Sequence, residues 1–128
     1  MIPSPYRILV AEDDEVNATV ARTILERLGC VVDVAPNGAK ALELFKRRKY
    51  DLVLMDWQMP VMDGLEATAR IRMTTRGGAT PIIATTASRD RAECLMAGMN
   101  DVVPKPYRVE KLRLILQRWT SWSDPTTS

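Results

Sequence analysis

Polar side chains that could carry out chemistry follow four short apolar runs of this sequence. They are Glu12 with Asp13, then Asp56, Thr86 and Lys105. Asp56 shows the pattern most clearly, because it directly follows the apolar residues 52–55. In an open sheet of parallel strands, the carboxyl ends of the strands meet at one edge, and ligands bind there. We therefore expect these side chains to converge on one site.

The types of these residues favour metal-dependent phosphoryl transfer. Carboxylates that lie close together repel one another, and their pKa values rise unless a cation neutralises them. Oxygen ligands without histidine or paired cysteine suit a hard ion such as Mg²⁺, which Asp13, Asp56 and the backbone of the following loop could hold. Phosphoryl transfer also needs a nucleophile, a cationic side chain and a hydroxyl donor. Asp56, Lys105 and Thr86 fit these three roles.

The sequence contains no histidine, and this excludes several other chemistries. Catalytic triads, histidine-based zinc sites and an internal histidine phosphodonor all depend on that residue. Nucleotide-binding glycine loops do not fit either, because Glu12 and Asp13 stand where such glycines would follow the first apolar run. The chemistry must therefore use carboxylates.

Apolar runs of strand length alternate with segments of helical period along the chain, which is typical of a parallel sheet with crossover helices. This pattern predicts strands at residues 7–11, 31–35, 52–55, 81–84 and 102–103.

The same pattern predicts five helices. The first has Asp14 as its N-cap, ends at Gly29 and presents apolar residues at helical spacing. These residues are Val16, Val20, Ile24 and Leu28. The second helix follows residues 36–38. The third, fourth and fifth run from about 64 to 73, 88 to 96 and 109 to 119. The loop at residues 74–80, which contains two glycines, is expected to be mobile.

Size and composition indicate one globular domain, because the chain has 128 residues with 46% hydrophobic and 27% charged side chains. A net charge of +2 gives no electrostatic case for binding nucleic acid or a membrane surface. No apolar stretch approaches the roughly 20 residues that cross a bilayer, and residues 1–5 lack the features of a signal peptide. Cys30 and Cys94 are expected to be reduced, buried thiols, so a cytoplasmic location is predicted.

Taken together, several segments resemble the receiver domain of two-component response regulators. They are residues 8–13, 51–60, 62–64, 81–87 and 105–106. The resemblance implies a flavodoxin-like (βα)5 fold, with a doubly wound, five-stranded parallel sheet in the strand order 2-1-3-4-5. It extends over residues 7–119 as one receiver domain. Residues 1–6 would then be an N-terminal extension, and residues 120–128 a C-terminal tail or linker.

By this resemblance Asp56 is the phosphoacceptor, and a bound Mg²⁺ would be the cofactor. Asp13 and Asp56 would be direct metal ligands, Glu12 would act through water, and Gln58 would lend its backbone carbonyl. Receivers catalyse their own phosphorylation from a donor and their own slow dephosphorylation. Gln58 and Ser88 occupy the positions that tune the access of water in the family.

Two further residues match the family's phosphoryl-binding groups. Thr86 matches the switch hydroxyl that moves toward the phosphoryl oxygen, and Lys105 matches the lysine that pairs with the phosphoryl group. The peptide bond between Lys105 and Pro106 is cis in most of the family. The position three residues before this lysine, which is aromatic in many members, is Val102 here. The usual rotation of an aromatic side chain therefore cannot occur.

The stretch 56–67 is most similar to receivers of hybrid histidine kinases and phosphorelays. Because the chain has no histidine, a histidine kinase or histidine phosphotransfer domain is implied as the phosphodonor. The resemblance places its docking surface around Val16, Asn17 and Val20 of the first helix. The chain would be a monomer or weak dimer, and either free-standing or part of a longer protein.

Two other functions stay open. A phosphohydrolase of the haloacid dehalogenase type would also use a strand-end aspartate, but it needs a second acid two residues later, where Gln58 stands. A phosphorylation-independent interaction module with a receiver fold would keep the pocket and bind its partners regardless of phosphate.

Overall fold

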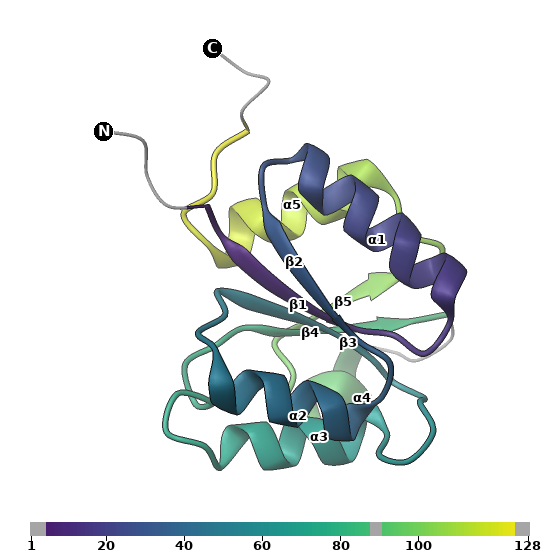
Figure 1. Cartoon of the computed structure of the whole chain (residues 1–128), viewed down its shortest axis with the longest axis vertical. Helices are drawn as coiled ribbons and strands as arrows, with labels where there is room; N and C mark the ends of the chain where they lie inside the picture. The colour runs from purple at the N-terminus through teal and green to yellow at the C-terminus, as the bar shows by residue number, and fades with distance from the viewer. Residues whose placement is uncertain (1–4, 88–90, 125–128) are drawn as a thin grey trace.

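The computed structural model describes residues 5–87 and 91–124, in which strands and helices alternate (Figure 1). The strands are β1 (Arg7–Ala11), β2 (Val31–Ala35), β3 (Leu52–Asp56), β4 (Ile82–Thr86) and β5 (Asp101–Pro104). The helices are α1 (Glu15–Arg27), α2 (Gly38–Arg47), α3 (Gly64–Arg72), α4 (Arg91–Met96) and α5 (Val109–Trp119).

The strands form one parallel sheet in the order β2-β1-β3-β4-β5, which confirms the predicted flavodoxin-like arrangement. Helices α1 and α5 cover one face of the sheet, and α2, α3 and α4 cover the other (Figure 1). Side chains of β1 alternate between the two cores: Ile8 and Val10 join the first, and Leu9 and Ala11 join the second. A strand buried on both faces must be apolar throughout, which explains the continuous apolar runs of the sequence.

Short polar side chains fix where the helices begin. Asp14, Asn37 and Asp63 are the N-caps of α1, α2 and α3, and each accepts a hydrogen bond from a backbone N–H three residues later. The predicted cap at Asp14 is therefore confirmed. Gly29, with φ of 89°, ends the first helix in a conformation that favours glycine.

The predicted apolar stripe of α1 is only partly buried. The residues that α1 turns to the core are Ala18, Ala21 and Leu25, with Leu28 just beyond the helix. Val16 and Val20 are 72% and 38% exposed. The face of α1 that packs on the sheet thus carries two alanines and a leucine, and the two valines lie on its exposed face.

Some predicted boundaries moved. Strand β3 extends to Asp56 and β5 extends from Asp101 to Pro104, whereas β4 begins one residue later than predicted, at Ile82, and ends at Thr86. Helix α4 is described from Arg91 onward, and its predicted start at Ser88 lies outside the described residues.

The loop at residues 74–80, which was expected to be mobile, is tied down by hydrogen bonds. The guanidinium of Arg72 donates to the carbonyl oxygens of Gly77 and Thr80, and also to Gly98 O and Asn100 Oδ1. Arg72 therefore links this loop to the turn before β5.

The described part of the predicted tail packs against the domain. Trp122 is 7% exposed, and its indole N–H donates to Leu28 O at 2.8 Å. Asp124 Oδ2 forms an ion pair with Arg113 Nε at 2.7 Å. Order thus continues beyond α5, and the domain boundary at Trp119 stays a prediction.

Cys30 and Cys94 are buried thiols outside any disulfide, as expected. Among the described residues, none of the helices is both long and apolar enough to span a bilayer.

Candidate functional site

The predicted functional residues gather at the carboxyl ends of the strands, on the right-hand side of Figure 1. Asp56 and Thr86 are the last residues of β3 and β4. Glu12 and Asp13 follow β1, and Lys105 follows β5, where its backbone N–H donates to Thr86 O at 3.1 Å. Parallel pairing carries each strand to the same edge, and the side chains of Glu12, Asp13, Asp56 and Lys105 converge there as expected. Thr86 ends the strand next to that of Asp56, and its part in the site stays a prediction.

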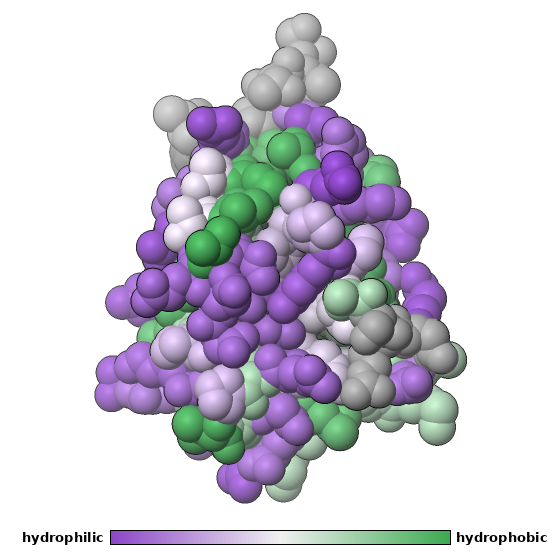
Figure 2. Space-filling view, turned by 90° about the vertical axis from the view of Figure 1, so that its right-hand side faces the viewer, coloured by the Kyte–Doolittle hydropathy of each residue, from purple (hydrophilic) through white to green (hydrophobic). Residues whose placement is uncertain are grey.

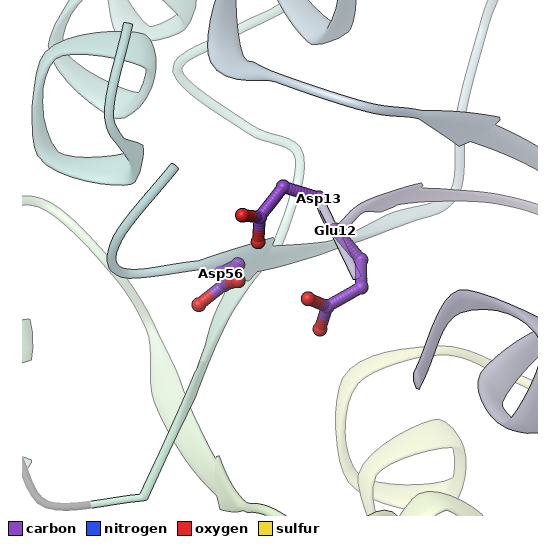
Figure 3. A group of neighbouring side chains, drawn as sticks. All are labelled: Glu12, Asp13 and Asp56. Atoms are coloured by element: carbon purple, nitrogen blue, oxygen red, sulfur yellow. The ribbon is translucent and has the colours of Figure 1, made fainter. Parts of the chain in front are cut away.

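Three carboxylates form an acidic group at this edge. In Glu12, Asp13 and Asp56, one oxygen from each lies within 4.8 Å of the others. Figure 3 shows the carboxylates of Asp13 and Asp56 one above the other, with that of Glu12 to one side. Glu12 and Asp56 are buried, whereas Asp13 is exposed. Oxygen ligands alone, one of them open to solvent, suit a hard divalent cation that keeps part of its water.

Lys105 bridges the two buried carboxylates. Its Nζ lies 3.0 Å from Asp56 Oδ2 and 3.1 Å from Glu12 Oε1. The side chain of Lys105 is only 19% exposed, so its ammonium group is largely shielded from bulk water. Salt screens the attraction within such partly buried pairs less than within surface pairs.

Burial raises the pKa of Asp56 to about 7, and the neighbouring charge of Glu12 adds to this rise while Lys105 opposes it. Burial also lowers the pKa of Lys105, but the two carboxylates outweigh it, so the net shift is upward. Lys105 is therefore positively charged at neutral pH. A further cation beside Asp56 would favour its ionised form.

The loop after β3 brings backbone groups close to Asp56. The N–H of Gln58 donates to Asp56 Oδ1 at 3.4 Å, and the N–H of Gly64 donates to Trp57 O at 3.1 Å. A Cβ at Gly64 would lie 2.0 Å from the carbonyl oxygen of Asp56, closer than real atoms approach. Glycine is therefore required where α3 begins, because the helix starts directly against the strand that carries Asp56.

Two expectations from the resemblance concern the segment around Lys105. The Lys105–Pro106 peptide bond is cis, as expected. Val102 is half-buried in β5, at the position that is often aromatic in the family. Ser88, the second residue expected to tune the access of water, lies outside the described residues.

Tyr107 belongs to the site, and sequence reasoning missed it. Its hydroxyl donates to Glu12 Oε1 at 3.1 Å, from a side chain that is 6% exposed. The signal available in the sequence was a tyrosine two residues after Lys105, where its phenol could reach the same pocket.

Figure 2 looks onto this end of the molecule and shows a hydrophobic patch set among hydrophilic side chains. The large hydrophobic side chains that α1 exposes are Val16 and Val20. They lie on the helix that begins next to Asp13, so an apolar surface adjoins the acidic group.

A family model for the response regulator receiver domain matches residues 8–117 of the chain. The aerobic respiration control sensor protein ArcB of Escherichia coli (strain K12) is 42% identical over 131 residues, which cover 99% of this chain and 17% of ArcB. The chain thus spans about a sixth of that curated relative.

Solved structures show the same similarity. The receiver domain of the sensor histidine kinase PA1611 from Pseudomonas aeruginosa PAO1 was crystallised with a magnesium ion in its active-site cleft. It matches with a TM-score of 0.85 and 42% identity, over 91% of this chain and 98% of that one. The receiver domain of Ssk1 from Saccharomyces cerevisiae, solved with the histidine phosphotransfer protein Ypd1, gives a TM-score of 0.84 and 25% identity, over 94% of this chain and 92% of the matched chain.

Proposed function

Because the chain belongs to the response regulator receiver domain family, we propose that it accepts a phosphoryl group from a histidine donor onto Asp56. One observation carries this proposal. The buried carboxylate of Asp56 ends β3 with Lys105 Nζ 3.0 Å away and with the carboxylate of Asp13 beside it. The nucleophile thus lies between a fixed cation and a candidate metal site, which is the arrangement that phosphoryl transfer needs.

Mg²⁺ is the cofactor that fits this site in the proposal. The acidic group would hold it directly through Asp13 and Asp56 and through water at Glu12, while Gln58 would add its backbone carbonyl. The PA1611 receiver, with magnesium in the corresponding cleft, supports this assignment. When bound, the ion neutralises negative charge on the transferred phosphoryl oxygens.

The side chains of the site would then act in sequence. A carboxylate oxygen of Asp56 attacks phosphorus in line, the bond from phosphorus to the imidazole nitrogen of the donor breaks, and the imidazole leaves with the electron pair. The ammonium group of Lys105 then forms an ion pair with one phosphoryl oxygen, and the hydroxyl of Thr86 donates a hydrogen bond to another. Later, water attacks phosphorus slowly, the bond from phosphorus to the Asp56 oxygen breaks, and the carboxylate of Asp56 is restored as phosphate leaves. The catalysis proposed is self-phosphorylation and this slow autodephosphorylation.

The test is intact-mass spectrometry after incubation with acetyl phosphate, a small phosphodonor. The chain is expected to gain one phosphoryl group when Mg²⁺ is present, and none after the metal is removed with a chelator. A gain that is independent of divalent metal would contradict the proposed cofactor. Failure to gain a phosphoryl group despite measured Mg²⁺ binding would favour the phosphorylation-independent interaction module.

The donor domain is proposed to dock on α1, where Val16, Asn17 and Val20 adjoin the acidic group. The Ssk1 receiver was crystallised with a histidine phosphotransfer protein, which supports a partner of this kind. Val16 and Val20 offer the apolar contact that such a partner needs. A histidine kinase domain is the other candidate donor.

Replacing Val20 with glutamate should slow phosphotransfer from a histidine phosphotransfer domain by about tenfold or more, since a charge in an apolar contact costs at least about 1.4 kcal/mol. The rate is measured with radiolabelled donor domain and compared with that of Thr23→Glu, a change at another exposed position of the same helix. Equal rates for the two variants would remove Val20 from the docking surface. The monomeric or weakly dimeric state and the cytoplasmic location stay predictions.

A further inference from the structure

Tyr107 is a buried residue that contacts the acidic group, and core packing alone does not explain why this position carries a hydroxyl group. The ring belongs to the core cluster on the α1 and α5 side of the sheet, together with Val10, Leu112 and Leu116. A phenylalanine would fill the same space without the cost of burying a polar atom. The hydroxyl of Tyr107 instead donates to Glu12 Oε1 at 3.1 Å. A tyrosine hydroxyl keeps its proton at neutral pH and can therefore act as a donor.

Three donors hold the carboxylate of Glu12. Oε1 accepts a hydrogen bond from the hydroxyl of Tyr107 at 3.1 Å and forms an ion pair with Lys105 Nζ, also at 3.1 Å. Oε2 accepts from the backbone N–H of Asp14 at 3.2 Å and from Lys105 Nζ at 3.4 Å. The side chain of Glu12 is fully buried, at 0% exposure, and a buried carboxylate is stable only where its oxygens are hydrogen-bonded. These donors therefore fix where the carboxylate lies.

The position of Lys105 depends in turn on Glu12. A lysine ammonium is a point charge on a flexible stem, so one carboxylate does not fix its place. Here the ammonium lies between two carboxylates, 3.1 Å from Glu12 Oε1 and 3.0 Å from Asp56 Oδ2. A continuous chain of contacts thus runs from Tyr107 through Glu12 and Lys105 to Asp56.

We propose that Tyr107 is a positioning residue for phosphoryl transfer: its hydroxyl fixes Glu12, and Glu12 keeps the ammonium of Lys105 beside Asp56. The inference rests on the proposed function, because the reaction it serves is the phosphorylation of Asp56. With acetyl phosphate, an Asp56 oxygen bonds to phosphorus, and the bond from phosphorus to the acetyl oxygen breaks. Acetate leaves with the electron pair. Tyr107 contributes no proton to this step and touches no reacting atom.

The test compares the unaltered chain with Tyr107→Phe. At saturating acetyl phosphate and Mg²⁺, the variant should be phosphorylated about tenfold more slowly, because it loses a hydrogen bond to a charged group. Its Mg²⁺ affinity is measured separately, because Tyr107 holds Glu12, which is proposed to contact the ion through water. Saturating Mg²⁺ keeps any change in affinity out of the rate comparison. In a Lys105→Ala background, Tyr107→Phe should change the rate by less than about twofold, because its effect passes through Lys105.

Tyr50→Phe is the matched control. Tyr50 is also a buried tyrosine, at 4% exposure, and its hydroxyl donates to Asp33 Oδ2 at 2.7 Å, outside the site. Its loss should cost stability but leave the phosphorylation rate within about twofold of the unaltered chain. If the Tyr107 hydroxyl had only a structural role, Tyr107→Phe and Tyr50→Phe would have the same phosphorylation rate.

A second measurement does not depend on phosphorylation. The carboxyl ¹³C signal of Glu12 and the ¹⁵Nζ signal of Lys105 should both shift in Tyr107→Phe at constant pH, and neither should shift in Tyr50→Phe. If the unaltered chain is phosphorylated and Tyr107→Phe is equally fast, the inference is overturned while the proposed function stands. If the unaltered chain gains no phosphoryl group, the proposed function fails and the two signals decide: the positioning role stands if both shift and is overturned if either does not.

Discussion

Replacing Asp56 with asparagine should abolish phosphorylation by acetyl phosphate in the presence of Mg²⁺. The amide lacks the anionic oxygen that attacks phosphorus. Neither of the other two carboxylates of the acidic group can replace it. Asp13 is exposed, and Glu12 is held by Lys105 and Tyr107. Intact mass should show a complete loss of the added phosphoryl group. Phosphorylation retained at another residue would contradict Asp56 as the acceptor.

Asp51→Asn is the matched control for this experiment, because Asp51 precedes the same strand at its opposite end. Its carboxylate accepts a hydrogen bond from the backbone N–H of Arg7 at 2.8 Å, far along β3 from the site. This variant should be phosphorylated like the unaltered chain. Asp56→Asn should also stay folded, with a change in unfolding free energy of about 1 kcal/mol or less, since it removes a buried carboxylate whose ionisation is costly.

Replacing Asp101 with alanine should lower the free energy of unfolding by about 3 kcal/mol, because it leaves buried donors without an acceptor. Asp101 is 2% exposed at the start of β5. Its carboxylate accepts from the indole N–H of Trp119, from the backbone N–H of Val102 and from the guanidinium groups of Arg91 and Arg118. It thus ties α4 and α5 to the edge strand of the sheet.

Urea unfolding measures this effect, with Glu43→Gln as the control. Glu43 forms ion pairs with Lys40 and Arg47 on the surface of α2, where its side chain is 45% exposed. Such pairs contribute about 1 kcal/mol or less. If the two variants lost equal stability, the buried network around Asp101 would have no special role.

The contribution of Asp101 should also depend on pH. Burial raises the pKa of Asp101, but the hydrogen bonds from Trp119, Val102 and Arg118 and the charge of Arg91 outweigh it, so the net shift is downward. The folded state therefore binds the proton less tightly than the unfolded chain, whose aspartates titrate near about 3.9. This stability is complete above that value and is lost as the pH falls through the lower, folded-state pKa. The difference between the unaltered chain and Asp101→Asn should accordingly shrink below about pH 4.

Val102 bears on how a phosphorylated site would signal. The half-buried valine cannot make the rotation expected of an aromatic side chain at this position, while Asp101 next to it binds α4 and α5. Any response of the face formed by α4, β5 and α5 would then have to come from shifts of loops and backbone.

The sequence by itself determined the order of the elements and the residues at their ends. Continuous apolar runs appear wherever a strand is buried on both faces, and Asp14 and Gly29 mark the ends of α1 through interactions with backbone groups a few residues away. Asp56 could be assigned to a site for the same reason, because every parallel strand delivers its carboxyl end to one edge. These features depend on local chemistry or on topology, so a pattern within one segment reveals them.

Tertiary structure alone decided the contacts between distant segments. The hydroxyl of Tyr107 meets Glu12 across 95 positions of sequence, and the indole of Trp122 meets Leu28 across 94. The residues next to Tyr107 or Trp122 in the sequence do not identify Glu12 or Leu28 as the partner. Packing also decided which face of α1 is buried, because its alanines lie against the sheet and Val16 is exposed. Which side chain is buried, and which donor holds a carboxylate, depends on how whole elements pack, and a single segment does not carry that information.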